Sequence, residues 1–403
     1  MLEAVTARAD DPDLRLGAWL GLGAFVLVVL AGRAQDLLPS PERMLLVLAW
    51  PVVAWLFERT RLAVVPLAYL MGGGLLLRLA HFGAGGSDHL AATNEAISVF
   101  LSGGDPYRHV YQSTIPPGSP VSQPPVELWL HLPGAVLGGL RGVMATETVA
   151  ALVVLLMLAW LATRISWTLG LPALGLYAAL GNLVNLTNDG SNDTSTGALV
   201  LLAALALVWA VRRTQDRVDD PRAIELAGVA GALAVGTKQT MLFLVLLLAV
   251  GLWQLRGQRT AWRYLAAAAV ALVILSAPFV LLGPIDFVRG IASFAGAHAD
   301  VYGWNIWVFA QQMGWPVLDP GPATAVDVLA TLAAFVIALA WWPQSVARGA
   351  AAGILVTLVL LLAARWTTYA YFAGLAPLIL ALPVLDAWEA GVTAVQTSEA
   401  GAT

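Results

Sequence analysis

Few residues of this chain are suited to catalysis, and one carboxylate stands apart from the rest. Asp88 follows Gly85, Gly86 and Ser87, and it begins a helical segment that runs to Leu101. A carboxylate at such a place can accept the proton of a substrate hydroxyl. The structural alternative is an N-terminal turn in which Ser87 caps the helix and Asp88 satisfies its dipole. Because Asp88 follows a hydrophobic segment, and ionisable groups at membrane helices are usually functional, we predict that it is catalytic.

Two isolated cations are candidates for binding an anionic group. Lys238 is the only lysine among 21 basic residues, and it lies between two apolar segments with almost no loop. Arg365 follows another apolar segment in the same way. The structural alternative for Lys238 is a side chain that extends from a helix end towards water. A fixed cation at a helix junction is what a phosphate group requires, so we predict that Lys238 and Arg365 contact phosphate.

Other polar side chains are predicted to bind substrate. Asp189 and Asp193 belong to a segment of amides, acids and hydroxyls between residues 185 and 196, for which a polar turn is the alternative interpretation. The remaining predicted binding residues are His89, Tyr107, His298, Asn305 and Tyr369. The histidines lack the close spacing of metal ligands and the chain has no cysteine, so we expect neither a metal nor a cofactor.

The composition indicates a membrane protein. Of 403 residues, 59% are hydrophobic and 11% are charged, whereas a soluble domain carries about 25% charged residues. The net charge of -4 includes no basic block, which argues against nucleic acid as a partner. The sequence therefore predicts an all-α polytopic protein, embedded in a membrane as a single domain over residues 1–403.

About twelve segments are apolar and long enough to be membrane helices. They are residues 16–32, 43–57, 62–80, 146–163, 168–186, 197–212, 223–237, 240–255, 261–282, 323–342, 349–364 and 370–388. With the N-terminus in the cytoplasm, thirteen of the 21 basic residues fall inside, as the positive-inside rule requires. The polar loops then all lie on the outer face of the membrane.

Two outer loops are long. The first, residues 81–145, includes an apolar run at residues 126–140 that is short and contains Pro133, which favours an interfacial or re-entrant helix over a further crossing. Together with the helix after Asp88, this predicts interfacial helices in the first loop. The second long loop spans residues 283–322.

The order of these motifs resembles a known family. An acid at the start of the first outer loop is followed by Gly104-Asp105-Pro106-Tyr107, a Pro-rich passage, the Gly236-x-Lys238 element and an aromatic element from Arg365 to Tyr371. This pattern resembles the GT-C membrane glycosyltransferases, most closely the polyprenyl-phosphate-mannose-dependent alpha-mannosyltransferases of glycosyltransferase family 87. The chain differs from many members at Asn94, where a tyrosine is common, and at Arg365, where a histidine is common.

The resemblance implies a GT-C-like bundle and an inverting transfer of a sugar, mannose or another hexose. The donor would be a polyprenyl-phosphate sugar, the acceptor a membrane lipid or glycan, and Asp88 the base, on the extracytoplasmic face of the cell membrane. A lipid or sugar transporter or flippase of an envelope pathway is the alternative. Transporters place polar groups near the middle of the membrane on broken helices, whereas the polar groups predicted here gather on one face, which favours the enzyme.

Overall fold

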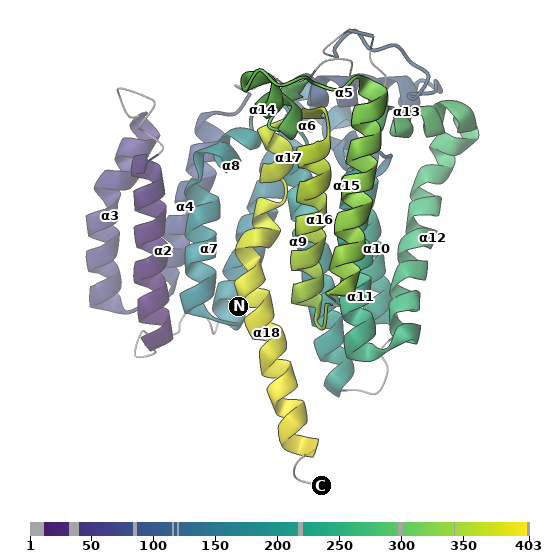
Figure 1. The fold of residues 1–403 in the computed structure, drawn as a ribbon. Helices are drawn as coiled ribbons and strands as arrows, with labels where there is room; N and C mark the ends of the chain where they lie inside the picture. The colour runs from purple at the N-terminus through teal and green to yellow at the C-terminus, as the bar shows by residue number, and fades with distance from the viewer. Residues whose placement is uncertain are drawn as a thin grey trace. The chain divides into compact units, whose positions relative to one another are not determined.

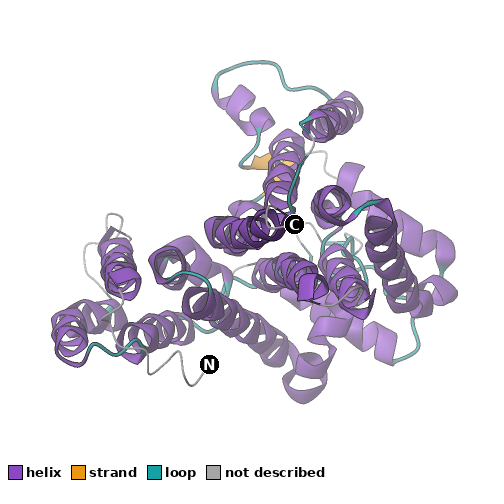
Figure 2. Cartoon of the chain, turned by 90° about the horizontal axis from the view of Figure 1, so that it is seen from below, coloured by secondary structure: helices purple, strands orange, loops and turns teal. Residues whose placement is uncertain are grey.

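The structure is a computed structural model that describes residues 12–31, 40–83, 87–114, 117–118, 121–216, 221–296, 301–341 and 343–400. These residues are almost entirely helical, with one pair of very short strands (Figures 1 and 2). Among them, eight helical segments are long and apolar enough to cross a membrane. The prediction of an all-α membrane protein with several crossings is confirmed.

The prediction of twelve crossings is supported only in part. All twelve predicted segments fall on helices, but four of these helices are not among the eight of spanning length and hydropathy. Those at residues 64–80 and 221–237 are each 17 residues long, the segment at 168–186 is broken into two helices, and Pro41–Thr60 is less apolar than the others. The count of twelve stays a prediction.

The chain divides into two compact units, where the sequence predicts one integrated domain. The first comprises Met1–Gly86, Glu147–Ala198 and Ala376–Thr403. Its elements are α2 (Pro12–Ala31), α3 (Pro41–Thr60), α4 (Val64–Ala80), the later part of α6 (Val126–Arg164), α7 (Trp167–Ala179), α8 (Gly181–Leu186), the start of α9 (Asp193–Asp216) and α18 (Ala376–Ala400).

Helices α2 and α7 make the closest packing of the first unit. A Cβ atom at Gly17 would lie 2.2 Å from the carbonyl oxygen of Trp167, and one at Gly175 would lie 2.5 Å from that of Gly21. Asp13 of α2 also accepts a 2.9 Å hydrogen bond from the backbone N–H of Trp167, at the N-terminus of α7. Small residues that let two backbones approach are typical of helix packing in membranes.

The second unit comprises Ser87–Thr146 and Leu199–Leu375. Its elements are α5 (His89–Leu101), the first part of α6, most of α9, α10 (Pro221–Thr237), η1 (Gln239–Met241), α11 (Leu242–Arg256), α12 (Gln258–Leu282), α13 (Pro284–Gly296), β1 (Tyr302–Gly303), α14 (Ile306–Gln312), α15 (Pro320–Ala340), α16 (Val346–Ala363), β2 (Trp366–Thr367) and α17 (Tyr369–Ala373).

Helices α11, α15 and α16 run alongside one another in the second unit (Figure 1). Glycines again set the spacing, since a Cβ atom at Gly349 of α16 would lie 2.4 Å from the carbonyl oxygen of Leu247 in α11. Helix α10 packs on α12 by the same means, with Gly228 against the carbonyl oxygen of Tyr264. The result is a bundle in which helix backbones nearly touch.

Helix α6 is two helices joined at a kink. Gly139 has φ 55° and ψ -139°, a conformation outside the helical region that a side chain would disfavour. On either side of it, Gly134 and Gly142 are so close that a Cβ atom at Gly142 would lie 1.9 Å from the carbonyl oxygen of Gly134. Residues 126–138 therefore fold back on the helix that follows and do not continue it. That they form an interfacial or re-entrant element stays a prediction.

Candidate functional site

The N-termini of α5 and α6 are joined by a buried hydrogen bond between His89 and Glu127. Glu127 is 0% exposed, and its Oε1 accepts hydrogen bonds from His89 Nε2 at 2.6 Å and from Thr93 Oγ1 at 2.8 Å. The other ring nitrogen, His89 Nδ1, lies 3.2 Å from the side-chain nitrogen of Gln123, which can donate to it. With both ring nitrogens in contact with the protein, His89 is held in one orientation. A positioning role is therefore favoured over the predicted substrate contact.

This arrangement places Asp88, the residue immediately before His89. Asp88 occupies the N-cap position of α5, but its side chain makes no capping hydrogen bond. Ser87 Oγ instead accepts a hydrogen bond from the backbone N–H of His89 at 3.3 Å. Ser87 therefore supports the start of α5, as in the structural alternative, while the carboxylate of Asp88 is half-buried. The role of Asp88 as the base stays a prediction.

Lys238 lies at an interruption between two helices. Helix α10 ends at Thr237, Lys238 is extended, and η1 leads directly into α11. Lys238 is only 5% exposed, and its Nζ lies 4.0 Å from the centre of the Tyr371 ring. A cation over an aromatic face is favourable, and more so where water is excluded.

The same turn offers two further groups to an anion. The hydroxyl of Thr240 is buried, and it has no hydrogen-bond partner within the described part of the chain. The backbone N–H groups at the start of a helix also lack partners within that helix, and the helix dipole attracts negative charge there. An ammonium group, a hydroxyl and a helix N-terminus at one turn are suited to binding phosphate.

The Lys238 turn contacts the first loop. The side chain of Gln239 donates a 3.1 Å hydrogen bond to the carbonyl oxygen of Ser122. A Cβ atom at Gly236 would lie 2.1 Å from a side-chain carbon of Val126. The segment from Ser122 to Glu127 therefore contacts both the Lys238 turn and His89.

Tyr107, which the sequence predicts to bind substrate, supports this segment from within the core. Its ring packs at 5.0 Å from that of Phe287, and its hydroxyl donates to the carbonyl oxygen of Gln123 at 2.8 Å. Burial raises the pKa of Tyr107, so the hydroxyl stays protonated as this donor. Its burial and its backbone partner favour a structural role over the predicted substrate contact.

Arg365 and Asn305 are joined where β1 pairs with β2. The carbonyl oxygen of Arg365 accepts hydrogen bonds from the backbone of Tyr302 and the side chain of Asn305, both at 3.0 Å, and its guanidinium donates to the carbonyl oxygen of Leu318. Asn305 also caps α14 by accepting from the backbone N–H of Val308 at 2.9 Å. The amide of Asn305 is thus occupied by backbone groups, which favours a structural role over the predicted substrate contact.

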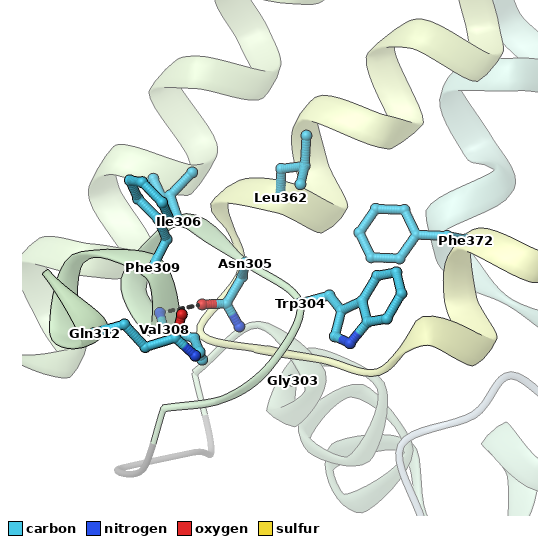
Figure 3. Close-up of a pocket in the computed structure, with 9 residues that line it drawn as sticks. All are labelled: Gly303, Trp304, Asn305, Ile306, Val308, Phe309, Gln312, Leu362 and Phe372. Carbon is cyan, nitrogen blue, oxygen red and sulfur yellow. Dashed lines mark hydrogen bonds between the residues drawn. The ribbon is translucent and has the colours of Figure 1, made fainter. Parts of the chain in front are cut away.

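A pocket of about 740 Å³ adjoins this sheet (Figure 3). Aromatic and aliphatic side chains dominate its lining, and the rings of Trp304 and Phe372 lie close together in it. Phe372 follows Tyr371 in α17, so consecutive residues contact the pocket and the Lys238 ammonium. The lining residues are Gly303, Trp304, Asn305, Ile306, Val308, Phe309, Gln312, Leu362 and Phe372.

The remaining predicted site residues are Asp189, Asp193, Tyr369 and His298. Asp189 and Asp193 belong to the first unit, where Asp189 accepts a hydrogen bond from the backbone of Ser191 at 2.8 Å and Asp193 begins α9. Tyr369 begins α17. His298 lies outside the described residues.

Sequence reasoning missed Gln123, Glu127 and Thr240. A signal was present for Glu127, because it is the only acidic residue in the apolar run at 126–140. An isolated acid in such a run must be paired or hydrogen-bonded when it is buried. Gln123 and Thr240 carry no comparable signal.

Glu95, the acidic residue within α5, predicts a pH dependence of the first loop. Burial would raise the pKa of Glu95, but hydrogen bonds from Ser113 at 2.7 Å and His109 at 2.9 Å outweigh it and lower the pKa below its usual value. This stabilisation is complete above the unfolded-state pKa, about 4.3, and is lost as the pH falls through the lower folded-state pKa. Hydrogen exchange of residues 89–114 should therefore accelerate as the pH falls below about 4, after correction for the intrinsic exchange rate. A Glu95→Gln variant with the same acid-induced acceleration would contradict this assignment.

The fold and this site together define the class of protein: a multi-pass, all-α integral membrane protein with polar groups buried between apolar helices. No protein-family model matches the chain, and no curated protein matches its sequence. Within the described residues, no group of three or more acidic, histidine or cysteine side chains is placed to hold a metal ion.

Proposed function

We propose that this protein is a membrane glycosyltransferase that uses a polyprenyl-phosphate sugar as donor. It would move mannose or another hexose, with inversion, to a lipid- or glycan-linked acceptor on the extracytoplasmic face of the cell membrane. The observation that carries the proposal is the buried Lys238 at a helix N-terminus. Thr240 in the same turn has a hydroxyl without a hydrogen-bond partner among the described residues, and Gln239 donates a hydrogen bond to the loop that places Asp88. Arg365 is the second candidate for a phosphate contact.

The reaction needs a base and a stabilised leaving group. The acceptor oxygen forms a bond to the anomeric carbon while its proton passes to Asp88. The bond from that carbon to the phosphate oxygen breaks, and its electron pair leaves with the polyprenyl phosphate. Negative charge therefore grows on the phosphate, where a fixed cation such as Lys238 stabilises the transition state most.

The apolar pocket suits the other end of such a donor. A polyprenyl phosphate joins an anionic head to a long hydrocarbon chain. Lys238 contacts Tyr371, and the next residue, Phe372, lines the pocket with Trp304 and Leu362. Consecutive residues of one short helix, Tyr371 and Phe372, would thus lie beside the head and the chain of the donor.

A lipid or sugar transporter is the second candidate, because one observation favours it. The predicted span at 168–186 is broken at Leu180, and the polar segment that follows is buried. Broken helices with buried polar groups are typical of transporters.

Purified protein in lipid vesicles separates these functions. We expect it to release polyprenyl phosphate from polyprenyl-phosphate mannose or glucose when membrane lipid and glycan acceptors are supplied, and to form a glycosylated acceptor. A transporter would move lipid or sugar between leaflets without breaking the glycosyl-phosphate bond. Absence of release with every donor and acceptor of this panel would contradict the proposal.

A further inference from the structure

In the first unit, a run of ten polar or small residues is buried in the protein. Every residue from 187 to 196 except Asp189 is buried, although amides, acids and hydroxyls make up nearly the whole segment. The sequence suggests a polar loop at the membrane surface here. Burial of so many polar groups is costly unless each finds a partner.

The segment follows a break that the protein supports. Helix α7 ends at Ala179, and the buried guanidinium of Arg78 donates to the carbonyl oxygens of Tyr177 at 3.0 Å and Ala178 at 3.1 Å, in the last turn of that helix. These carbonyls have no partners within the helix, so Arg78 acts as a cap for it. The break is therefore a stabilised feature of the fold.

Most groups of the segment are satisfied internally. The buried carboxylate of Glu147 accepts a 2.9 Å hydrogen bond from the backbone N–H of Ser195, in the first turn of α9. The hydroxyls of Ser195 and Thr196 donate to the carbonyl oxygen of Asn192, at 2.8 Å and 3.0 Å. The backbone of the segment is thus held rigidly at the start of α9.

Three atoms in or beside the segment remain without a hydrogen-bond partner among the described residues. They are the side-chain oxygen of Asn188 and the hydroxyls of Ser191 and Thr148, on residues that are 3%, 6% and 9% exposed. The nitrogen of the Asn188 amide donates to the carbonyl oxygen of Val184 at 3.2 Å, which leaves its oxygen as the group to be satisfied. Buried polar atoms in folded proteins are nearly always hydrogen-bonded, so these three oxygens are candidates for contact with a ligand.

We propose that Thr148, Asn188 and Ser191 belong to a binding site for the hydroxyl groups of a neutral carbohydrate. The oxygen of Asn188 requires a donor, whereas the two hydroxyls can either donate or accept. Sugar hydroxyls supply both, but a fully ionised phosphate supplies no donor. This proposal does not depend on the proposed transfer reaction, because a sugar transporter would also need a carbohydrate-binding site.

Two conservative substitutions test the site. Ser191→Ala and Thr148→Val remove hydroxyls that make no hydrogen bond within the described protein, so together they should not lower the unfolding temperature. Thr163→Val is the matched control, since the Thr163 hydroxyl donates to the carbonyl oxygen of Trp160 at 3.0 Å in the same unit.

Saturation-transfer NMR of the protein in nanodiscs measures binding of methyl α-mannopyranoside and methyl α-glucopyranoside. We expect a saturable signal from at least one of them, weakened about tenfold in the double variant and unchanged in Thr163→Val. Lack of a saturable signal from both sugars, or equal binding by the double variant, would overturn the proposal. The unfolding temperature gives a further test. If it falls when choline replaces Na⁺ and does not change when sugar is added, the three oxygens bind a cation and the proposal is overturned. None of these outcomes depends on transferase activity, so this site and the proposed function can fail separately.

Discussion

Replacing Asp88 with asparagine should abolish sugar transfer and leave the protein folded. Asparagine has nearly the same shape, but it cannot take the proton of the acceptor hydroxyl, and loss of a general base typically costs about 10²- to 10⁴-fold in rate. The side chain makes no capping hydrogen bond to α5, so the helix does not depend on the carboxylate for its N-cap. The measurement is the rate of polyprenyl phosphate release by the variant in vesicles, beside its unfolding temperature.

Asp319→Asn is the matched control for this substitution. Asp319 occupies the N-cap position of α15, is exposed and makes no side-chain capping hydrogen bond. Asp319→Asn makes the same chemical change at another helix N-terminus of the same unit, and this variant should transfer sugar at the normal rate. An Asp88→Asn protein that keeps near-normal activity would exclude Asp88 as the base.

Lys238→Met should reduce transfer by about 10²- to 10³-fold, the usual effect of removing one group that stabilises developing charge. Methionine keeps the length and the apolar stem of the side chain, so the contact with Tyr371 is replaced by a sulfur–aromatic contact and packing is preserved. The lower rate should come from weaker interaction of the protein with the phosphate group of the donor. Inhibition by added polyprenyl phosphate should weaken together with the rate, because both depend on the ammonium group.

Arg108→Met is the control for Lys238→Met. Arg108 is an exposed cation of the first loop, and its removal changes net charge equally without touching the helix interruption. Its rate and product inhibition should match those of the unmodified protein. If Lys238→Met retained full inhibition by polyprenyl phosphate, the phosphate would have to bind elsewhere, whatever the effect on rate.

The hydrogen bond between His89 and Glu127 links the positions of these two substitutions. Glu127 and Gln123 hold His89, and therefore its neighbour Asp88, while Ser122 in the same short segment accepts a hydrogen bond from Gln239 beside Lys238. The predicted base and the predicted phosphate cation are thus positioned by one support. The support itself is built from residues that the sequence did not single out.

Much of the molecule could be predicted from the sequence alone. The low charged fraction and the long apolar segments indicated a membrane protein of many helices. Lys238 was conspicuous because it is the only lysine. These properties are local, since hydropathy and helix length depend on residues close together in the chain.

Which groups meet was decided only by the tertiary structure. His89 and Glu127 are 38 residues apart in the chain, and Gln239 and Ser122 are 117 apart. No local pattern indicates that Tyr107 and Asn305 are committed to backbone partners, or that the polar segment before α9 is buried with three oxygens unsatisfied. Burial and pairing depend on how helices pack across such separations, and a linear sequence specifies that packing only through the fold as a whole.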